Sequence, residues 1–378
     1  MIPIYTPYLP PHALKYAHDA LDSTWISSHG KYIDMAQERL QDLLGVKHVI
    51  LTANGTCACH LMSKALRRNI GGYGKKDVLV PSNSYVAVWN SLLFDKEFRL
   101  ITVKTDLDTW NIDLNDLDEK LDRYPNAAVE IVPNMGGVIN TPALKEKYPN
   151  TTFIEDSCEA IFGTYNGRMV GSAGFVSAFS GFANKTITGG EFGFAATSSD
   201  EAYEYMELVS NQGQSERRFV HSTIGVNYRC TNVVASIVFG QLEVLPEILE
   251  KKSNIFERYR AAFGDRDDVK MQQTGEGTTN ANWMFGLRFV NGMSYDHAEN
   301  FFKNQKNIEV RPMFYPITAH KYLVDNDDVL IDRDDVAEQL NREVVIFPSY
   351  PDLKREESMY IIECIEEYIN GQAKNNKE

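Results

Sequence analysis

Seven short apolar runs, each ending in a polar or glycine-containing turn, alternate with segments of helical period through the first 200 residues. The runs are HVILTAN (48–54), DVLVPS (77–82), RLITVKTD (99–106), AVEIVPNM (128–135), TTFIEDS (151–157), FVSAFSG (175–181) and GFAATS (193–198). Nearly continuous apolar strands are typical of a parallel or mixed sheet that helices bury on both faces. The sequence therefore predicts an α/β fold in which ligands bind beyond the carboxyl ends of the strands.

Helices are visible between these runs. One helix is predicted by apolar residues that recur at the helical spacing and form one face, namely Ala58, Leu61, Met62, Ala65 and Leu66. A similar but less pure period begins at Ile237, and Pro246 either interrupts it or opens the next turn.

The strand rhythm changes from about residue 251, where a long charged helical segment begins. A polar loop at 273–282 and the strand-like WMFGLRFV (283–290) follow it. A chain of 378 residues is long enough for one large and one smaller domain. We expect a large cofactor-binding domain over 1–250 and a small α+β domain over 251–378.

Charge and composition narrow the classes of partner. The net charge of −14, from 52 acidic and 38 basic residues, argues against nucleic acid, because neutralising phosphates requires a basic face. No stretch approaches the ~18 apolar residues of a membrane span, and MIPIYTPYLPPH lacks the features of a signal peptide. We therefore expect a cytoplasmic protein without a membrane partner.

The cysteines indicate neither a disulfide framework nor a metal site. There are five of them, an odd number that is widely scattered. Cys57 and Cys59 have no second pair at metal-ligand spacing, so they are interpreted as packing residues and no metal is expected.

A glycine-containing motif follows the first run. In NGTCACH (54–60), Asn54, Gly55 and Thr56 stand between a strand and a helix that begins at once. Glycine allows close approach of a ligand, and the free N–H groups and dipole of a helix start favour an anion. The motif fits a phosphate seat, and the alternative is that Asn54 or Thr56 simply caps the helix.

Acidic residues end the fifth run. In FIEDSCEAIFG (153–163), Glu155 and Asp156 follow two apolar residues, and Glu159 comes three residues later. A carboxylate on a buried strand is costly unless it meets a positive partner, such as a protonated ring nitrogen. The alternative is an acid at the strand end that is solvated or paired with an arginine.

One lysine follows the sixth run. In FSGFANKTITGGEFG (179–193), Lys185 comes a few residues after the predicted strand, at the same carboxyl edge of the sheet. A lysine taken alone in a loop is more often solvated, but a desolvated one can form an imine with an aldehyde. Pyridoxal phosphate (PLP) requires three features, in this order along the chain: a phosphate-binding site, an acid for the ring nitrogen and such a lysine.

These motifs belong to a series that runs through nearly the whole chain. After WISSHGKYI (25–33) come NGTCACH, PSNSYVAVWN (81–90), FIEDSCEA, FSGFANKTITGGEFG, GVNYRCTNVVASIVFGQLE (225–243), IEVRPMFYPI (308–317) and FPSYPDL (347–353). The series resembles the PLP-dependent nucleotide-sugar aminotransferases of the DegT/StrS type, and the seven motifs that follow WISSHGKYI in order are specific where one is weak. The resemblance implies fold type I, with a mostly parallel, mixed seven-stranded sheet.

The resemblance also implies roles around the cofactor ring. Lys185 would be the catalytic residue that binds the cofactor covalently and moves a proton as general base and acid. Asp156 would meet the pyridine nitrogen, Glu159 would lie near the ring hydroxyl, and Tyr85 would stack on the ring.

Further residues are implied for the cofactor phosphate. Gly55, Thr56 and Ser180 would hold it, and Asn227 from a neighbouring subunit would complete the site. The resemblance thus implies a homodimer with shared active sites and an inactive monomer.

The implied reaction is ping-pong transamination from L-glutamate to a keto sugar on a nucleotide diphosphate. Arg229, Arg311 and Tyr315 are candidates for binding the donor carboxylate or the diphosphate, and structural ion pairing is the alternative for each arginine. The motifs are similar to those of enzymes that aminate C4 of a 4-keto-6-deoxy sugar. We expect UDP- or dTDP-4-keto-6-deoxyglucose and a viosamine-type product, with GDP-4-keto-6-deoxymannose and GDP-perosamine as the alternative.

Three positions depart from the family pattern. Phe192 stands where the family has a glycine, and a phenylalanine there requires a normal φ and more room. Gly181 stands where an aromatic residue is usual, and we expect Phe192 to fill part of that space. Thr318 follows FYPI in place of a histidine, which affects the sugar site more than the cofactor site.

Three other functions fit the sequence less well. Family members that remove a sugar hydroxyl carry histidine in place of the lysine, so Lys185 favours transamination. A non-catalytic regulatory or scaffold protein would be expected to have lost Lys185 or Asp156, and both are present. A dinucleotide-dependent oxidoreductase requires GxGxxG after the first strand, and NGTCACH lacks that spacing.

Overall fold

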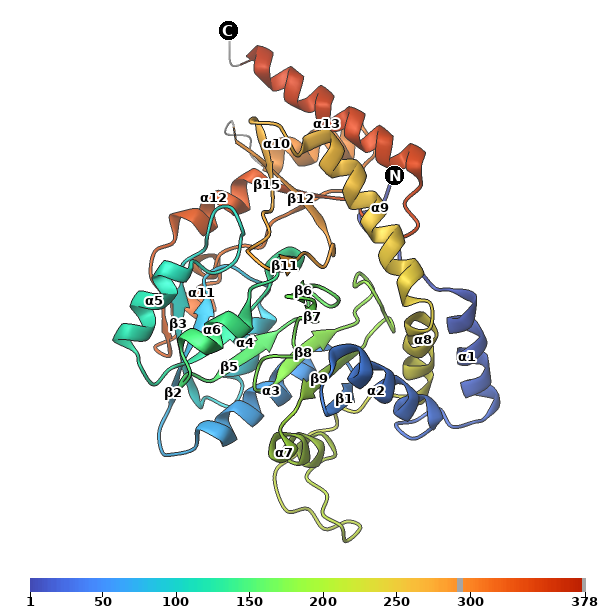
Figure 1. Ribbon diagram of the computed structural model, residues 1–378, viewed down its shortest axis with the longest axis vertical. Helices are drawn as coiled ribbons and strands as arrows, with labels where there is room; N and C mark the ends of the chain where they lie inside the picture. Colours follow the sequence, from blue (N-terminus) through green and yellow to red (C-terminus); the bar gives the residue numbers. More distant parts are fainter. Residues whose placement is uncertain (291–294, 376–378) are drawn as a thin grey trace.

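An eight-stranded sheet crosses the centre of the molecule in the computed structural model, which describes residues 1–290 and 295–375 (Figure 1). Its strands, in spatial order, are β1 (His48–Thr52), β9 (Gly193–Thr197), β8 (Ser177–Ser180), β5 (Phe153–Asp156), β4 (Ala128–Ile131), β2 (Lys76–Pro81), β3 (Phe98–Val103) and β14 (Val329–Leu330). Neighbouring strands are parallel except where β9 pairs with β1 and β8. The sheet is mixed and mostly parallel, as expected, but it has eight strands rather than the expected seven.

All seven apolar runs form strands of this sheet, so that prediction is confirmed. The eighth strand, β14, comes from much later in the chain and pairs with Leu100 and Ile101 of β3. A strand of two residues is too short to show a period, which is why the sequence did not reveal it.

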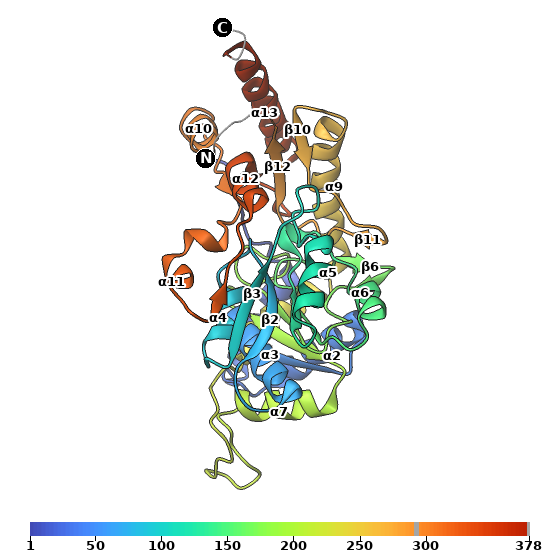
Figure 2. The same cartoon turned by 90° about the vertical axis from the view of Figure 1, so that its left-hand side faces the viewer.

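Helices cover both faces of the sheet (Figures 1 and 2). On one face, α3 (Gly55–Ile70), α4 (Ala87–Leu93) and α7 (Asp200–Ser210) share a core with strand residues such as Val78 and Ile154. On the other face, α5 (Leu114–Arg123) and α6 (Thr141–Lys147) cover β3 and β4, and α2 (Lys31–Leu44) and α8 (Asn232–Leu242) cover β1 and β9. The predicted apolar face of residues 58–66 is buried against the sheet within α3.

Pro246 opens a new helix rather than interrupting an old one. It lies in the first turn of α9 (Leu245–Phe263), just after α8 ends. Proline is tolerated there because the N–H groups of the first turn have no partner within the helix. Over the two described ranges, no single helix is long and apolar enough to span a membrane, and α8 and α9 reach that length only as a pair bent by 66°.

The C-terminal part of the chain builds a second sheet beside the first. Its strands are β10 (Val269–Met271), β12 (Phe285–Phe289), β15 (Val344–Phe347) and β13 (Arg311–Pro312), and the helices around it are α9, α10 (Tyr295–Glu299), α12 (Asp335–Glu343) and α13 (Arg355–Asn375). The short α11 (Lys321–Val324) precedes β14. Because β14 returns to the large sheet, the domain division at residue 250 stays a prediction.

A small third sheet lies between the two larger ones. It consists of β11 (Thr278–Thr279), β6 (Thr164–Tyr165) and β7 (Arg168–Met169). It links the polar loop at 273–282 to the segment that follows β5.

The strand order determines where the polar strand ends meet. Strands β1, β5 and β8 end in Thr52, Asp156 and Ser180, which therefore lie at the same edge of the sheet. Gly193 begins the antiparallel β9 between Thr52 and Ser180. A Cβ at Gly193 would lie 2.4 Å from the backbone of Asn54, so only glycine lets the turn after β1 come this close.

Candidate active site

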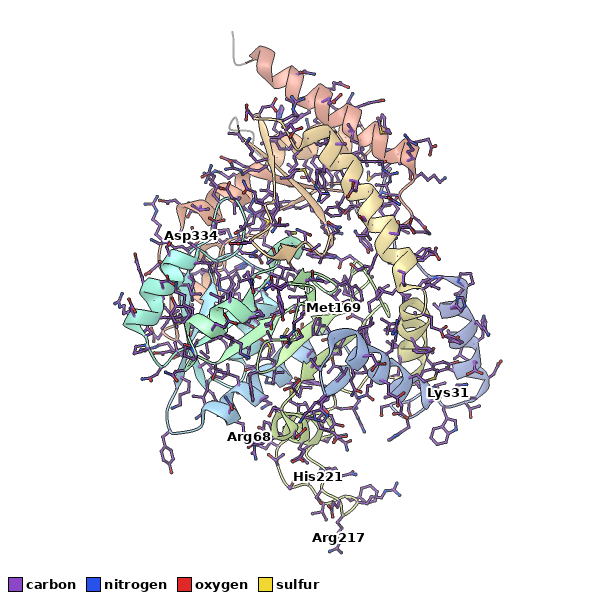
Figure 3. The ribbon with its side chains drawn as sticks, viewed as in Figure 1. Lys31, Arg68, Met169, Arg217, His221 and Asp334 are labelled. Carbon is purple, nitrogen blue, oxygen red and sulfur yellow. The ribbon has the colours of Figure 1, made fainter. Side chains whose placement is uncertain are left out.

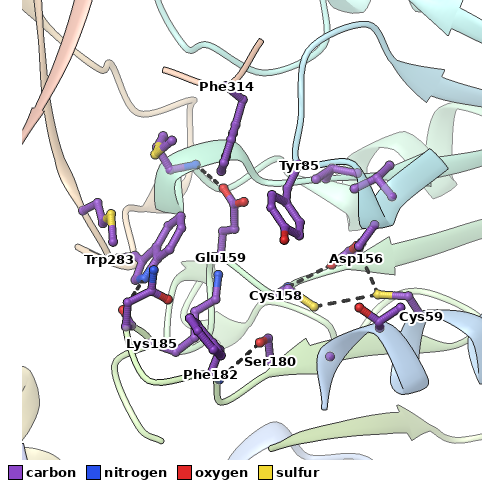
Figure 4. A pocket seen from close by; sticks show the side chains of 18 of the residues that line it. Cys59, Tyr85, Asp156, Cys158, Glu159, Ser180, Phe182, Lys185, Trp283 and Phe314 are labelled. Carbon is purple, nitrogen blue, oxygen red and sulfur yellow. Dashed lines mark hydrogen bonds between the residues drawn. The ribbon is translucent and has the colours of Figure 1, made fainter. Parts of the chain in front are cut away.

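A pocket of about 510 Å³ opens at this carboxyl edge. Its floor comes from β5, β8 and the start of α3, and its opposite wall comes from the segment around β13 and from Trp283, just before β12. Figure 4 shows the side chains that face one another across it. Residues of NGTCACH, FIEDSCEA and FSGFANKTITGGEFG all line this pocket.

The start of α3 forms one end of the pocket. The side chain of Asn54 caps the helix, because its Oδ1 accepts a hydrogen bond from the N–H of Cys57 at 3.0 Å. A Cβ at Gly55 would lie 2.7 Å from the Cβ of Ser180, so glycine is required for the start of α3 to approach the end of β8. Gly55, Thr56 and Ser180 line the pocket here, so the cap and an open anion-binding corner are present together.

Asp156 lies on the pocket floor and is 3% exposed. Its Oδ2 accepts from the thiol of Cys59 at 3.2 Å, and its Oδ1 accepts from the N–H of Cys158 at 3.1 Å. No lysine, arginine or histidine in the described ranges forms an ion pair with it, so the expected arginine alternative does not occur. A buried carboxylate without a cation remains available for a positively charged ligand.

The neighbouring Glu155 has a structural role instead. It points away from the pocket and accepts hydrogen bonds from the N–H groups of Gly171, Ala173 and Gly174. It is neither solvated nor paired with an arginine, and it holds the turn at 171–174 beneath the sheet.

Lys185 is 9% exposed and lines the pocket across from Asp156. Its Nζ lies 3.6 Å from the centre of the Trp283 ring. The indole N–H of Trp283 in turn donates to the carbonyl of Asn184 at 2.8 Å, and the hydroxyl of Tyr5 donates to the carbonyl of Lys185 at 3.0 Å. Burial lowers the pKa of Lys185, which is therefore the desolvated amine that the sequence indicated.

Glu159 is buried on the same side of the pocket as Lys185 (Figure 4). Its Oε2 accepts from the N–H of Met135 at 2.9 Å. Burial raises the pKa of Glu159 to about 7, although the charge of Lys185 acts in the opposite direction. Glu159 and Lys185 therefore influence each other's charge inside the pocket, because each acts on the pKa of the other.

A further buried acid lies on the strand next to that of Asp156. Glu130 of β4 is fully buried, and neither of its carboxyl oxygens has a hydrogen-bond partner among the described residues. Burial, and to a lesser degree the charge of Asp156, raises the pKa of Glu130 well above its usual range. The charged form of Glu130 is therefore disfavoured in this environment.

Tyr85 and Arg311 stand at the mouth of the pocket. Tyr85 is 56% exposed, and its ring lies 5.9 Å from the ring of Phe314, centre to centre. Arg311 of β13 lines the opening and has only a loose ion pair with Glu309, at 3.8 Å.

Three predicted residues lie outside the pocket of their own chain. Asn227 and Arg229 are on the loop 211–231 between α7 and α8, where Arg229 donates to Asn227 Oδ1 at 3.0 Å and to Asn211 Oδ1 at 2.8 Å. This loop projects from the body of the protein, as the labels of Arg217 and His221 in Figure 3 show. Tyr315 lines a separate, shallow surface hollow that also contains Thr318.

The departures at Gly181 and Phe192 compensate each other. Phe192 is completely buried and does not adopt a positive φ. A Cβ at Gly181 would lie 2.5 Å from Cδ1 of Phe192, so the phenylalanine ring occupies the space that a side chain at 181 would fill. This expectation is confirmed.

Sequence reasoning missed Trp283, Cys59 and Cys158 as pocket residues. Trp283 falls within the predicted strand 283–290, where an aromatic residue signals packing. Cys59 was interpreted as a packing residue of a helix, and it does pack there, but its thiol also reaches Asp156. Only the order of the strands brings these residues to one pocket.

Comparisons with known proteins identify relatives along the whole chain. Residues 8–366 match the DegT/DnrJ/EryC1/StrS aminotransferase family. The GDP-perosamine synthase of Escherichia coli O157:H7 is 30% identical over 372 residues, which cover 98% of this chain and 99% of that protein. The GDP-perosamine synthase of Vibrio cholerae is 31% identical over 380 residues, which cover 98% of this chain and 100% of that protein.

A solved structure shares the fold. It is the Escherichia coli GDP-4-keto-6-deoxy-D-mannose-3-dehydratase with bound hydrated PLP, which superposes with a TM-score of 0.88 at 21% identity and covers 96% of this chain and 99% of that one. The fold expected from the sequence is therefore confirmed.

Proposed function

This chain belongs to the DegT/DnrJ/EryC1/StrS aminotransferase family, and on that premise we propose that it transfers the amino group of L-glutamate to C4 of a GDP-linked 4-keto-6-deoxy sugar. The family makes the protein a PLP-dependent sugar aminotransferase. The finer choice of substrate rests on one observation, the likeness to two GDP-perosamine synthases from end to end of the chain.

The relatives favour the GDP-perosamine alternative over the viosamine-type product that we expected. Perosamine differs from 4-keto-6-deoxymannose by the amine that replaces the C4 ketone, so GDP-4-keto-6-deoxymannose is the substrate that we propose. The motifs alone indicated amination at C4, and the relatives add the preference for a GDP-linked sugar.

The residues of the pocket fit PLP. Asp156 is a buried carboxylate that lacks a cationic partner within the described ranges, and a protonated ring nitrogen suits it. Lys185 offers a buried amine whose Nζ makes no hydrogen bond in the same part of the chain. The corner at Gly55 combines a helix start with two hydroxyl groups, which suits a phosphate.

When bound, PLP supplies an aldehyde that can carry an amino group and a protonated ring that draws electrons from the reacting carbon. We propose that Lys185 holds the aldehyde and that Asp156 keeps the ring nitrogen protonated. The remaining residues proposed to hold the cofactor are Gly55, Thr56, Ser180, Tyr85 and Glu159.

Lys185 is the proposed general base and acid. Because burial lowers its pKa, more of its amine is neutral near pH 7, and Nζ can accept a proton from a substrate carbon. Trp283 limits the positions of Nζ, since it packs against the amine and also holds the carbonyl of the preceding residue. Glu159, with a pKa of about 7, can hold or release a compensating proton beside it.

We further propose a homodimer in which Asn227 of the partner subunit reaches the phosphate corner. Asn227 lies outside the pocket of its own chain, on the projecting loop 211–231. The same loop exposes Phe219 to 77% and Ile224 to 89%, and exposed apolar side chains that cluster are typical of an interface.

Arg311 is the cation that we propose for the sugar diphosphate or the donor carboxylate, because it lines the pocket and is only loosely paired. Arg229 orients Asn227 through its hydrogen bond, so its effect on the substrate would be indirect. Tyr315 would contact the substrate only beyond the pocket mouth.

Two measurements test the proposed function. Purified protein loaded with PLP is first mixed with L-glutamate, and loss of the visible absorbance of lysine-bound PLP is expected. The glutamate-treated protein is then offered GDP-, UDP- and dTDP-linked 4-keto-6-deoxy sugars, and the amino sugar is identified by mass spectrometry. Preference for the GDP-linked sugar supports the proposal, whereas faster amination of a UDP- or dTDP-linked sugar contradicts it.

A further inference from the structure

A pair of thiols lies against Asp156 at the bottom of the pocket. The Sγ of Cys59 donates to Asp156 Oδ2 at 3.2 Å, and the Sγ of Cys158 lies 3.9 Å from that of Cys59 (Figure 4). The backbone N–H of Cys158 donates to the other oxygen of Asp156 at 3.1 Å. Both oxygens of this carboxylate are therefore held by a cysteine residue.

The proton count gives these hydrogen bonds a direction. A thiol has one proton to donate, and a carboxylate is the stronger of the two acceptors near Cys59. The S–H of Cys59 therefore points to Asp156, and the sulfur of Cys59 also contacts that of Cys158 at 3.9 Å. Cys158 is half-buried and Cys59 is 1% exposed, and both line the pocket together with Asp156.

Both thiols keep their protons in this environment. The hydrogen bond with Cys158, burial and the charge of Asp156 together raise the pKa of Cys59 well above its usual range. The hydrogen bond with Cys59 lowers the pKa of Cys158, but burial and the charge of Asp156 outweigh it and raise that pKa to about 11. Cys59 is thus a donor to Asp156 throughout the neutral range.

We propose that Cys59 is a positioning residue for the cofactor, whose S–H fixes the carboxylate of Asp156 towards the ring nitrogen and is itself oriented by Cys158. This inference rests on the proposed PLP chemistry of the pocket. A thiol is a weak donor, so it holds the carboxylate in place while leaving most of its charge for the ring nitrogen.

The test compares the affinity for PLP of matched variants, measured by absorbance titration of the cofactor-free protein. Cys59→Ala removes the donor, and Cys59→Ser restores one in a similar shape. Cys364→Ala, on α13 in the C-terminal core, controls for loss of a cysteine elsewhere. The two sulfurs of Cys59 and Cys158 and a carboxylate oxygen of Asp156 lie within 4.8 Å of one another, and these atom types bind zinc, so every titration contains EDTA.

Cys59→Ala is expected to weaken PLP binding by about tenfold, as loss of one hydrogen bond to a buried charge implies. Cys59→Ser and Cys364→Ala should bind within about twofold of the unmodified chain. Cys158→Ala keeps the backbone N–H that donates to Asp156, so its affinity for PLP should lie between those of Cys59→Ala and Cys59→Ser. It takes the place of Cys59→Ala in the test if that variant does not fold. Thermal unfolding of each cofactor-free variant detects a packing defect. Such a defect lowers the stability of the variant, and serine at position 59 would then not restore the affinity for PLP.

The outcomes distinguish the inference from the function on which it rests. If the unmodified chain binds PLP and Cys59→Ala binds it equally well, the positioning role is wrong and the proposed function stands. The same conclusion follows if Cys59→Ser binds as weakly as Cys59→Ala, because a donor would then not be what matters. If the unmodified chain does not bind PLP, the proposed function itself is wrong and the inference falls with it.

Discussion

The Nζ of Lys185 lies 3.6 Å from the centre of the Trp283 ring, although the two residues are 98 positions apart in the sequence. The aromatic face favours the charged amine, while burial favours the neutral one. Trp283 also holds the carbonyl of Asn184, so it restrains both the backbone and the amine of the segment that carries Lys185.

The first prediction separates these two restraints. Trp283→Leu, which loses the ring face and the N–H donor, should lower turnover by roughly ten- to a hundredfold, as loss of about 2 kcal/mol implies. Trp283→Phe keeps a ring face and should lose less. Turnover is measured with saturating PLP, and equal losses in the two variants would show that the ring face has no role.

The second prediction concerns Lys185 itself. Lys185→Ala should abolish transamination, because no other lysine among the residues that the structure describes lines the pocket. It should also prevent covalent attachment of PLP, measured by mass spectrometry after borohydride reduction. Lys252→Met, which removes a buried lysine outside the pocket, is the control for attachment and should still be labelled. Turnover by Lys185→Ala near that of the unmodified chain would contradict the proposed mechanism.

The third prediction tests the shared site. Lys185→Ala and Asn227→Ala should each be inactive, but co-expressed with different tags they should form mixed dimers with one intact site. A random mixture is then expected to recover about a quarter of full activity, because half of the dimers are mixed and each has one complete site of two. Mixed dimers that are isolated through both tags and remain inactive would contradict a site completed by the partner's Asn227.

The fourth prediction concerns the pH dependence of stability. Burial lowers the pKa of Lys252 from 10.5 to about 7. Between these values the unfolded chain binds a proton that the native state does not, so this group makes the free energy of unfolding rise with pH over that window. The penalty for burying the charged form is complete below about pH 7.

Lys252→Met should remove this pH dependence. The Nζ of Lys252 donates to the carbonyls of Trp283 and Ser349, so Lys252→Met is also expected to be less stable than the unmodified chain at high pH. Urea unfolding of both proteins at several values from pH 7 to 10 gives the comparison. If the difference between the two free energies does not change with pH, the amine is charged in the native state.

The fifth prediction concerns the compensating pair at 181 and 192. Phe192→Ala should lower the free energy of unfolding by about 3–5 kcal/mol, because it leaves a cavity in the core. Gly181→Phe alone should also destabilise the protein, by about 1–3 kcal/mol, since the new side chain meets the Phe192 ring. Gly181→Phe combined with Phe192→Gly should recover part of the loss in the same denaturation assay, and a purely additive effect would refute the compensation.

Local patterns were sufficient for much of the fold. The seven runs predicted strands of the large sheet, and the residues 58–66 predicted the buried face of α3. Each of these elements buries most of its length, so a few consecutive residues show the apolar pattern that predicts its burial. The two-residue strand β14 is stabilised by its pairing with β3, and its own residues show no pattern that predicts a strand.

The candidate site divides in the same way. Asp156, Lys185 and the turn at Gly55 were visible in the sequence, because each ends or follows a strand at the carboxyl edge. Which side chains meet them was not visible. Cys59 reaches Asp156 because β1 and β5 lie on either side of β9 and β8, so that α3 crosses beneath the end of β5.

The sequence by itself therefore determined the kind of chemistry, through residue types delivered by strand ends. Only the tertiary structure decided which neighbours tune those groups: Trp283 beside Lys185, Cys59 against Asp156, and Asn227 outside the pocket of its own chain. Periodicity reports the burial of a segment, which depends on adjacent residues. Contacts between segments a hundred residues apart depend on strand order and packing, which no local pattern records.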